Sequence, residues 1–376
     1  MFFGKIDNPI GLDISELSVK FTQLEPNGSF LKLSAFADVD LPEGLVSNDM
    51  VANEGGMVDF LKDIFTNPTH HNGRIVGRSI VASIPESKAY VRVINLPPLL
   101  PDELITAVPL EAEQYIPLPL DQMELDWQLV SSSNENSRVL ITATPKDYVG
   151  KLVEIMRRAS LIPQALEVES AAIVRSVLPK DSTSPIPGTL ILDMDAARTS
   201  LIVFAENSVQ FTSSIPMAGN AITDAIVQRL QVAKEEAEHI KRLHGIPLLD
   251  QTRQRLAPEV AKLMSEITVA LDPVLNNLYD EVKNTIKFHE EHSDTELSDL
   301  SLIRQVLLCG GTSKLPNIVD YLQGKISSDE SFSRREIKVS QADPWHNIVG
   351  SGLPPFSRHE ALSYTTSLGL ALRNYT

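Results

Sequence analysis

Two stretches about half the chain apart share one pattern, and this internal repeat constrains the fold more than any other feature. The first runs from Ile10 to Phe30 and the second from Leu190 to Phe211. In each, an apolar segment ending in Leu-Asp leads through a short polar turn into a second apolar segment, and then through a turn with Asn into a third. Such runs are typical of β-hairpins. We therefore expect two related lobes with Asp13 and Asp193 at matching strand ends. The alternative is that any two hairpins look alike at this level.

The composition indicates a strongly acidic globular protein. Its 376 residues are 43% hydrophobic and 22% charged, which suits two lobes with ample cores. The net charge of −16 disfavours binding to nucleic acid and unaided adsorption to an anionic bilayer. The single cysteine, Cys309, excludes an internal disulfide and favours a reducing compartment. We find no signal peptide and no run of about 18 apolar residues, so we expect a cytoplasmic protein.

The order of the expected strands and helices indicates an α/β fold with two lobes and a small insertion. Strand patterns at Arg78–Pro85 and Ala89–Pro97 precede a helix, a hairpin and an amphipathic helix. The Pro- and Ser-rich stretch Leu178–Gly188 is typical of a hinge. The expected parts are a first lobe core at residues 1–83 and 164–185, an inserted α+β subdomain at 84–163, a second lobe at 186–355 with a long helical part at about 220–292, and a closing helix at 356–376.

Several residues at strand ends could bind a nucleotide or its Mg²⁺, although each also has a purely structural explanation. Asp13 and Asp193 could hold a hydrated Mg²⁺, which needs only one or two carboxylates, or could simply cap their turns. Gly310 and Gly311 follow an apolar strand pattern and precede a helix, where backbone N–H groups can approach an anion closely. An ordinary tight turn would use the same two glycines.

Two further pairs admit both interpretations. Ser18 and Lys20 could contact a phosphate, or could be exposed strand residues. Glu238 and Lys241 lie three apart on one expected helix and could bind a ribose. The alternative for this second pair is a solvated ion pair worth roughly a few tenths of a kcal/mol.

Taken together, these segments resemble the actin-like (ribonuclease H-like) ATPase superfamily, and within it the PilM family of type IV pilus assembly proteins, which is related to the division protein FtsA. The resemblance covers nearly the whole chain. Its most specific part is Glu111–Leu120 with the following hairpin, which resembles the inserted subdomain that separates this family from actin and sugar kinases. The other segments are IGLDISELSVK, VASIPESKAYVRVINLPPL, ILDMDAARTSLIVF, AITDAIVQRL with EEAEHIK, LLCGGTSKLPNIVDYL and SLGLALR.

The resemblance implies a site for ATP and Mg²⁺ with two phosphate-binding hairpins. It places Asp13, Ser18 and Lys20 in the first hairpin, and Asp193 and Thr199 in the second, with both Asp residues as catalytic and Mg²⁺-binding groups. The other implied contacts are Gly219 of the Ala218–Gly219 pair, Glu238 and Lys241 at the ribose, and Gly310, Gly311 and Thr312 at the adenosine. Glu167 or Glu169 is implied near the γ-phosphate, and Glu167 is the expected catalytic residue of the two.

Two departures from the family pattern indicate a weakened nucleotide site. Ser15 and Asp195 each replace a loop glycine. A serine can still donate a hydroxyl, so Ser15 is tolerable as a nucleotide-binding residue. Asp195 is more damaging, because a carboxylate about 4 Å from a phosphate charge costs roughly 4 kcal/mol at an effective dielectric constant near 20. Mg²⁺ or an outward rotamer could offset this cost. We therefore expect weak or absent ATP hydrolysis, with nucleotide binding left open.

The resemblance also implies a function and a partner. It indicates a cytoplasmic scaffold at the inner face of the cytoplasmic membrane, which binds the N-terminal tail of PilN in a groove between the first lobe core and the insertion. Candidate groove residues are Val91–Leu104 and Tyr115–Leu120, whose apolar side chains could instead fill the insertion's core. Other pilus platform proteins are expected partners, self-association is left open, and the membrane is reached only through partners.

Two rival functions use the same fold. An FtsA-like membrane filament protein would call for an amphipathic helix beyond the core, whereas this sequence stops at Leu372–Thr376. A small-molecule kinase would need intact phosphate loops, and Ser15 and Asp195 count against it. The pilus scaffold is therefore the favoured interpretation.

Overall fold

The computed structural model describes residues 8–28, 30–180, 184–247, 257–292, 300–333, 335–348 and 354–375. The chain forms two compact units. The first comprises Met1–Ser184, Asn207–Ser213 and Asp343–Thr376, and the second comprises Pro185–Glu206 and Ser214–Ala342. Of the expected hinge Leu178–Gly188, residues 181–183 lie outside the described residues, and the division between the units falls after Ser184.

The first unit is built on a six-stranded sheet. Its order is β11 (Ile162–Val168), β7 (Ser79–Ile84), β1 (Ile10–Ile14), β2 (Ser18–Asn27), β3 (Phe30–Asp40) and β6 (Asn72–Gly73). Strands β11, β7 and β1 are parallel, and the remaining neighbours are antiparallel. The short strands β4 (Val46–Ser47) and β5 (Met50–Val51) form a separate hairpin. Strand β1 is buried almost throughout, as expected for a strand whose sheet is covered on both faces.

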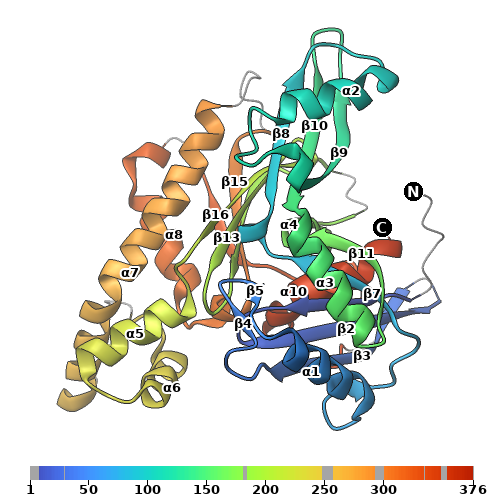
Figure 1. The fold of residues 1–376 in the computed structure, drawn as a ribbon. Coiled ribbons are helices and arrows are strands. Elements are labelled where there is room, and N and C mark those ends of the chain that lie inside the picture. The colour runs from blue at the N-terminus through green and yellow to red at the C-terminus, as the bar shows by residue number, and fades with distance from the viewer. Residues whose placement is uncertain are drawn as a thin grey trace. The chain divides into compact units, whose positions relative to one another are not determined.

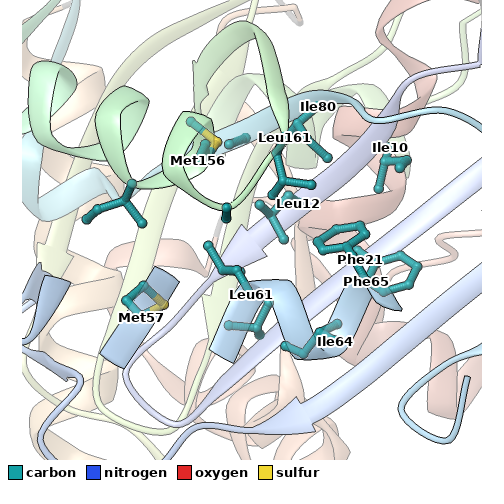
Figure 2. Close-up of a cluster of buried hydrophobic side chains, with 14 of the residues drawn as sticks. Ile10, Leu12, Phe21, Met57, Leu61, Ile64, Phe65, Ile80, Met156 and Leu161 are labelled. Atoms are coloured by element: carbon teal, nitrogen blue, oxygen red, sulfur yellow. The ribbon is translucent and has the colours of Figure 1, made fainter. Parts of the chain in front are cut away.

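One face of this sheet packs against α1 (Glu54–Thr66) and α3 (Lys146–Arg158). The buried side chains of α1 recur at helical spacing and are Met57, Val58, Leu61, Ile64 and Phe65. Figure 2 shows this core, in which the rings of Phe21 and Phe65 stack with centroids 4.9 Å apart. Leu152, Ile155 and Met156 of α3 belong to the same core. Helix α3 therefore packs with the first lobe, which corrects our placement of the whole of 84–163 in the insertion.

Side chains alternate between the two faces of a strand, so the opposite face presents Gly11 and Val81 to other helices. Val81 packs with Ala172 of α4 (Glu169–Val177) and Leu370 of α10 (Thr365–Ala371). A Cβ added to Gly11 would lie 2.1 Å from Ser367 O, so only a glycine lets α10 approach β1 this closely.

The C-terminal segment returns to the first unit as four short pieces. They are α9 (Arg358–Ala361), η6 (Leu362–Tyr364), α10 and η7 (Leu372–Asn374), where we expected one closing helix. A capping box between Ser357 and Glu360 starts α9. Trp345 and Ile348 pack with Leu24 and Leu33 in the same unit. This corrects our placement of residues up to 355 in the second lobe.

The inserted part of the first unit is a helix on an antiparallel sheet. The sheet runs in the order β9 (Met123–Ser132), β10 (Ser137–Pro145), β8 (Tyr90–Leu96) and β14 (Ser208–Ile215), of which residues 208–213 belong to this unit. Figure 1 shows α2 (Pro101–Ala112) beside β8, β9 and β10. Leu104, Val108 and Ala112 on the inner face of α2 pack on Ile94 and Ile141. The short helix η1 (Glu86–Lys88) precedes β8, and the short helix η2 (Leu120–Gln122) lies between α2 and β9.

The second unit contains a sheet in the order β16 (Lys338–Gln341), β15 (Ile303–Cys309), β12 (Gly188–Met194) and β13 (Thr199–Ala205). Its helices are α5 (Gly219–Leu230), α6 (Lys234–His244), α7 (Pro258–Glu291), η4 (Gly311–Lys314), α8 (Ile318–Ser328) and η5 (Glu330–Phe332). Helix α7 is the long helix expected from sequence, and its buried face includes Ile267, Leu271 and Leu278.

The two units share one strand order, which confirms the predicted repeat. In β11-β7-β1-β2 and in β16-β15-β12-β13, the first three strands are parallel and the last closes an antiparallel hairpin. Asp13 lies opposite Lys20 in the first hairpin, and Asp193 lies opposite Ser200 in the second. The two hairpins therefore correspond in both position and register.

Candidate functional site

The turn between β1 and β2 is closed by the side chain of Ser15. Its Oγ donates to Ser18 O at 3.0 Å and accepts from Ser18 N at 3.3 Å, while Ser15 N also donates to Ser18 O at 3.0 Å. A hydroxyl carries one hydrogen. The Ser15 hydroxyl therefore has no hydrogen left to donate to a phosphate while this turn keeps its shape.

Three predicted residues of the first hairpin gather at one end of the sheet. Asp13 is buried at the end of β1 and accepts from Ser83 Oγ of the parallel strand β7 at 2.8 Å. Lys20 Nζ donates to Ser18 Oγ at 2.6 Å and lies 3.7 Å from Asp38 Oδ1. The carboxyl ends of parallel strands are the usual place for ligands in such sheets. Sequence reasoning missed Ser83, because only the pairing of β1 with β7 brings it to Asp13.

Glu167, expected near a γ-phosphate, is held by two arginines. Its carboxylate accepts from Arg175 Nη1 at 2.7 Å and from Arg175 Nη2 at 3.0 Å, and it forms an ion pair with Arg373. Arg175 also donates to Gly369 O at 2.8 Å. This arrangement joins β11, α4 and the C-terminal segment, so the packing gives Glu167 a structural role. Its catalytic role stays a prediction.

Glu169 is the other candidate for a polar group near the γ-phosphate. It opens α4, and its Oε2 accepts from Glu86 N at 3.3 Å. Burial, followed by the charges of Glu169, Asp49 and Asp13, raises the pKa of Tyr148. The three acids therefore share the surroundings of one tyrosine, which favours Glu169 over Glu167 as a polar group beside the first hairpin.

Glu86 is a buried acid that sequence reasoning overlooked. Its Oε1 accepts from Ser170 N at the start of α4 at 2.7 Å, whereas its Oε2 is buried with no partner within hydrogen-bond distance among the described residues. Burial raises the pKa of Glu86 and outweighs the opposing hydrogen bonds from Ser170 and Thr212. The segment Pro85-Glu86-Ser87 looks like an ordinary polar turn, so the sequence carried no sign of this burial.

The second hairpin places Asp193 and Thr199 at the end of β12 and the start of β13. Asp193 is buried, and Cys309 Sγ lies 3.4 Å from its Oδ1. Thr199 Oγ1 donates to Met217 O at 2.6 Å. Gly310 has φ +80, and a Cβ there would lie 2.7 Å from Asp193 Oδ1. Gly310 thus permits a close approach of the backbone to Met194 and Asp193, and its predicted contact with an adenosine stays a prediction.

The turn between β12 and β13 is bound by the start of α5. Asp195 N donates to Arg198 O at 3.0 Å and closes the turn, while Gly219 N donates to Asp195 O at 3.2 Å. Asn220 N donates to Ala196 O at 2.7 Å. The first N–H groups of a helix are the ones that can bind an anion. Here two of them are already used by the carbonyl groups of the turn.

Thr312 adds a further link to the same turn. Its Oγ1 donates to Asp195 O at 2.6 Å. A Cβ on Gly219 would lie 2.5 Å from Thr312 Oγ1 and 3.4 Å from Lys241 Nζ. The structure thus brings together Gly219, Lys241 and Thr312, three of the contacts that the resemblance implies. However, Lys241 Nζ donates to Gly219 O at 3.2 Å and Thr312 Oγ1 donates to Asp195 O, so both side chains already have protein partners.

The predicted ribose pair, Glu238 and Lys241, belongs to an internal network. Lys241 Nζ lies 2.6 Å from Glu238 Oε2 and donates to Gly219 O at 3.2 Å and to Thr223 Oγ1 at 2.9 Å. Partial burial opposes ionisation of Glu238, but the hydrogen bonds from Lys241 and Thr223 lower its pKa to about 2. Sequence reasoning missed Thr223, although it lies four residues after Gly219 on the same helix.

These residues fit ATP and Mg²⁺ poorly in this arrangement. The amides of Gly219 and Asn220 that open α5 and the Lys241 ammonium have protein partners, and Asp195 adds a carboxylate to the turn where the resemblance implies a glycine. Within the described ranges, no group of three or more His, Cys, Asp or Glu side chains could hold a metal ion. A Mg²⁺ that keeps its waters needs fewer carboxylates. Its binding by Asp13 and Asp193 therefore stays a prediction.

Comparison with known proteins identifies the family. The sequence model of the type IV pilus assembly protein PilM matches residues 11–375. The chain belongs to the PilM family. A chain of the solved PilM–PilN type IV pilus biogenesis complex resembles this PilM family member with a TM-score of 0.77 and 22% identity, covering 99% of this chain and 100% of that chain. The ethanolamine utilization protein EutJ from Carboxydothermus hydrogenoformans gives a TM-score of 0.53 at 14% identity, covering 99% and 92%. At these identities the likeness shows the two-lobe actin-like fold alone.

Curated relatives of this PilM family member are cell division proteins named FtsA. The protein from Pseudomonas aeruginosa is 25% identical over 235 residues, which are 56% of this chain and 54% of the relative. The protein from Bacillus subtilis is 22% identical over 302 residues, or 80% of this chain and 63% of the relative. The chain thus spans about half to two thirds of the length of these two relatives. None of the described helices is both long and apolar enough to span a bilayer.

Proposed function

We propose that this chain is a cytoplasmic scaffold of the type IV pilus inner-membrane platform that binds the N-terminal tail of a PilN-type membrane protein. The observation that carries the proposal is the likeness to a chain of a PilM–PilN complex, which extends over 99% of this chain and 100% of that one. The inserted subdomain, α2 with β8, β9 and β10, is the part expected to contribute to the peptide groove. The protein reaches the membrane through this partner.

The exposure of the candidate groove residues narrows the proposed binding surface. Ile94, Leu96, Leu104 and Ile116 are buried in the insertion's core and cannot contact a peptide without unfolding it. Leu100, Tyr115 and Leu118 are exposed. The Tyr115 ring lies under Arg92 of β8, with the guanidinium carbon 5.1 Å from the ring centroid. This contact holds the tyrosine against the sheet, so we assign peptide binding to Tyr115 and Leu118.

Fluorescence anisotropy with a labelled synthetic PilN-tail peptide tests this function, with and without Mg·ATP. We expect saturable binding to the parent chain and an affinity at least tenfold lower for the double variant Tyr115→Ser, Leu118→Ser. Exposed Val269 of α7 supplies the matched control, Val269→Ser, which removes a comparable apolar side chain from the second unit. Absence of binding to the parent at 0.1 mM peptide, a generous limit for a specific tail interaction, would refute the proposal.

We further propose that nucleotide regulates this scaffold weakly or not at all, because the second hairpin is already closed by protein contacts. Asp195 O accepts from both Gly219 N and Thr312 Oγ1. Isothermal titration with Mg·ATP and a phosphate-release assay test the point. Micromolar binding together with steady turnover would contradict it.

A further inference from the structure

The solvent-facing side of α2 carries apolar side chains that the insertion's core does not use. The side chains of α2 that are buried in the insertion's core are Leu104, Val108 and Ala112, which recur every four residues along one side of the helix. Ile105 and Leu110 are 62% and 65% exposed. Together with Asp102, Pro109 and Glu113, they fall at the i, i+3, i+7, i+8 and i+11 spacing of a single helix face. This outer face of α2 is apolar in its middle and acidic at both ends.

The sequence around α2 contains acidic residues and no basic ones. From Val93 to Ser137 the chain has eight Asp and Glu residues and no Lys, Arg or His. The flanking Arg92 lies over Tyr115, and the flanking Arg138 donates to Gln210 Oε1 at 2.6 Å, so both already have partners at the sheet. Lys146 reaches the segment by donating to Asp121 O at 2.8 Å, beyond α2 in sequence. The charge per residue of this segment, −8 over 45 residues, is therefore more negative than the average of −16 over 376 residues for the whole chain.

The N-terminal end of α2 is capped by the chain itself and needs no ligand. Pro101 occupies the first turn, where it costs no hydrogen bond. Glu103 Oε2 accepts from Leu100 N at 2.7 Å and so caps the same turn. A partner would meet a rigid surface, which lowers the entropy lost on binding. With twelve residues, α2 offers a face about 18 Å long.

We propose that the outer face of α2 is a second docking surface, and that its occupant is a basic amphipathic helix of a partner protein. Apolar residues of such a helix would cover Ile105 and Leu110, and its Lys or Arg residues would reach Asp102 and Glu113. Charge disfavours the other occupants. A second copy of this chain would bring a net charge of −16 towards an acidic face, and an anionic bilayer would be repelled in the same way. The surface includes neither Tyr115 nor Leu118, which we assign to the PilN tail.

The test uses a probe of defined pattern. An 18-residue peptide of Leu and Lys, with Leu at i, i+3, i+4 and i+7, is compared by fluorescence anisotropy at 0.15 M NaCl with a peptide of the same composition whose Leu residues fall on all sides of a helix. We expect the patterned peptide to bind the parent at least tenfold more tightly. The double variant Ile105→Gln, Leu110→Gln should lose that preference, whereas the matched surface control Val269→Gln should keep it.

Equal affinity of the two peptides would mean attraction by net charge alone and would overturn the proposal, as would unchanged binding to the Ile105→Gln, Leu110→Gln variant. Circular dichroism of that variant should match the parent, because both side chains are exposed. The PilN-tail peptide is titrated in the same experiment. If it displaces the patterned peptide, the two surfaces are one and the inference fails, even though the scaffold function stands. If the PilN-tail peptide never binds but the patterned peptide does, the second docking surface stands and the proposed scaffold function fails.

Discussion

Asp195 carries a carboxylate in the β12–β13 turn, which its backbone groups close. The carbonyl and amide of Asp195 make the hydrogen bonds that close the β12–β13 turn, and a glycine at this position could make the same ones. The carboxylate is the added feature. We expect Asp195→Gly and Asp195→Asn to bind Mg·ATP at least tenfold more tightly than the parent, which corresponds to about 1.4 kcal/mol.

Isothermal titration measures this change. Exposed Asp272 on α7 provides the control variant Asp272→Asn, which removes one negative charge from a helix outside the turn and should leave the affinity unchanged. Tighter binding in Asp272→Asn as well would assign the effect to net charge. A gain in Asp195→Gly but not in Asp195→Asn would show that the bulk of the side chain, and not its charge, weakens the site.

Glu86 makes a second residue-scale prediction, this one on pH. Burial raises its pKa in the folded protein above the value of about 4.3 in an unfolded chain. The folded state then holds the proton more tightly, so the stabilisation is complete below about pH 4.3 and is lost as pH rises through the folded pKa. Glu86→Gln imitates the protonated acid at every pH, so the variant does not lose this stabilisation as pH rises. Urea unfolding should show that the free energy of unfolding of the variant, relative to that of the parent, is higher at pH 8 than at pH 5. The same difference at both pH values would contradict a raised pKa for Glu86.

At the scale of elements, the packing of α10 against α4 depends on Gly369. A Cβ at this position would lie 1.8 Å from Ala172 O, a backbone atom that cannot move aside cheaply. We expect Gly369→Ala to lower the free energy of unfolding by about 3 kcal/mol, at the upper end for overpacking. Gly150 of α3 has nothing within 4 Å of its Cβ position, so Gly150→Ala should instead stabilise by roughly 0.5–1 kcal/mol. Urea denaturation of both variants tests the contrast. Similar effects of the two substitutions would show that helix propensity dominates.

At the scale of the whole molecule, the net charge of −16 sets the response to salt. Self-repulsion among like charges destabilises a compact state, and added salt screens it. We expect the melting temperature to rise by a few degrees between 20 mM and 0.3 M NaCl at constant pH. Differential scanning fluorimetry measures the shift. A fall would indicate that ion pairs such as Arg175–Glu167 contribute more to stability than the repulsion removes.

The sequence by itself determined the repeat, the α/β fold and the family. The Leu-Asp strand ends at Asp13 and Asp193 depend on local pattern, and the structure gives both hairpins the matching register that the pattern predicted. The helical part expected at about 220–292 is likewise helical, and the structure divides it into α5, α6 and the long helix α7. These features are readable because strand and helix periods are local properties of a chain.

Only the tertiary structure decided which polar groups are satisfied by the protein itself. Lys241 and Thr312 were predicted as ligand contacts from their motifs, yet their hydrogen bonds go to Glu238, Thr223 and Asp195. Glu167 meets Arg175 and Arg373, which lie eight and more than two hundred residues away in sequence. Spacing along a helix shows which side chains share a face, but the partner of a buried polar atom is set by segments that fold against it from elsewhere in the chain.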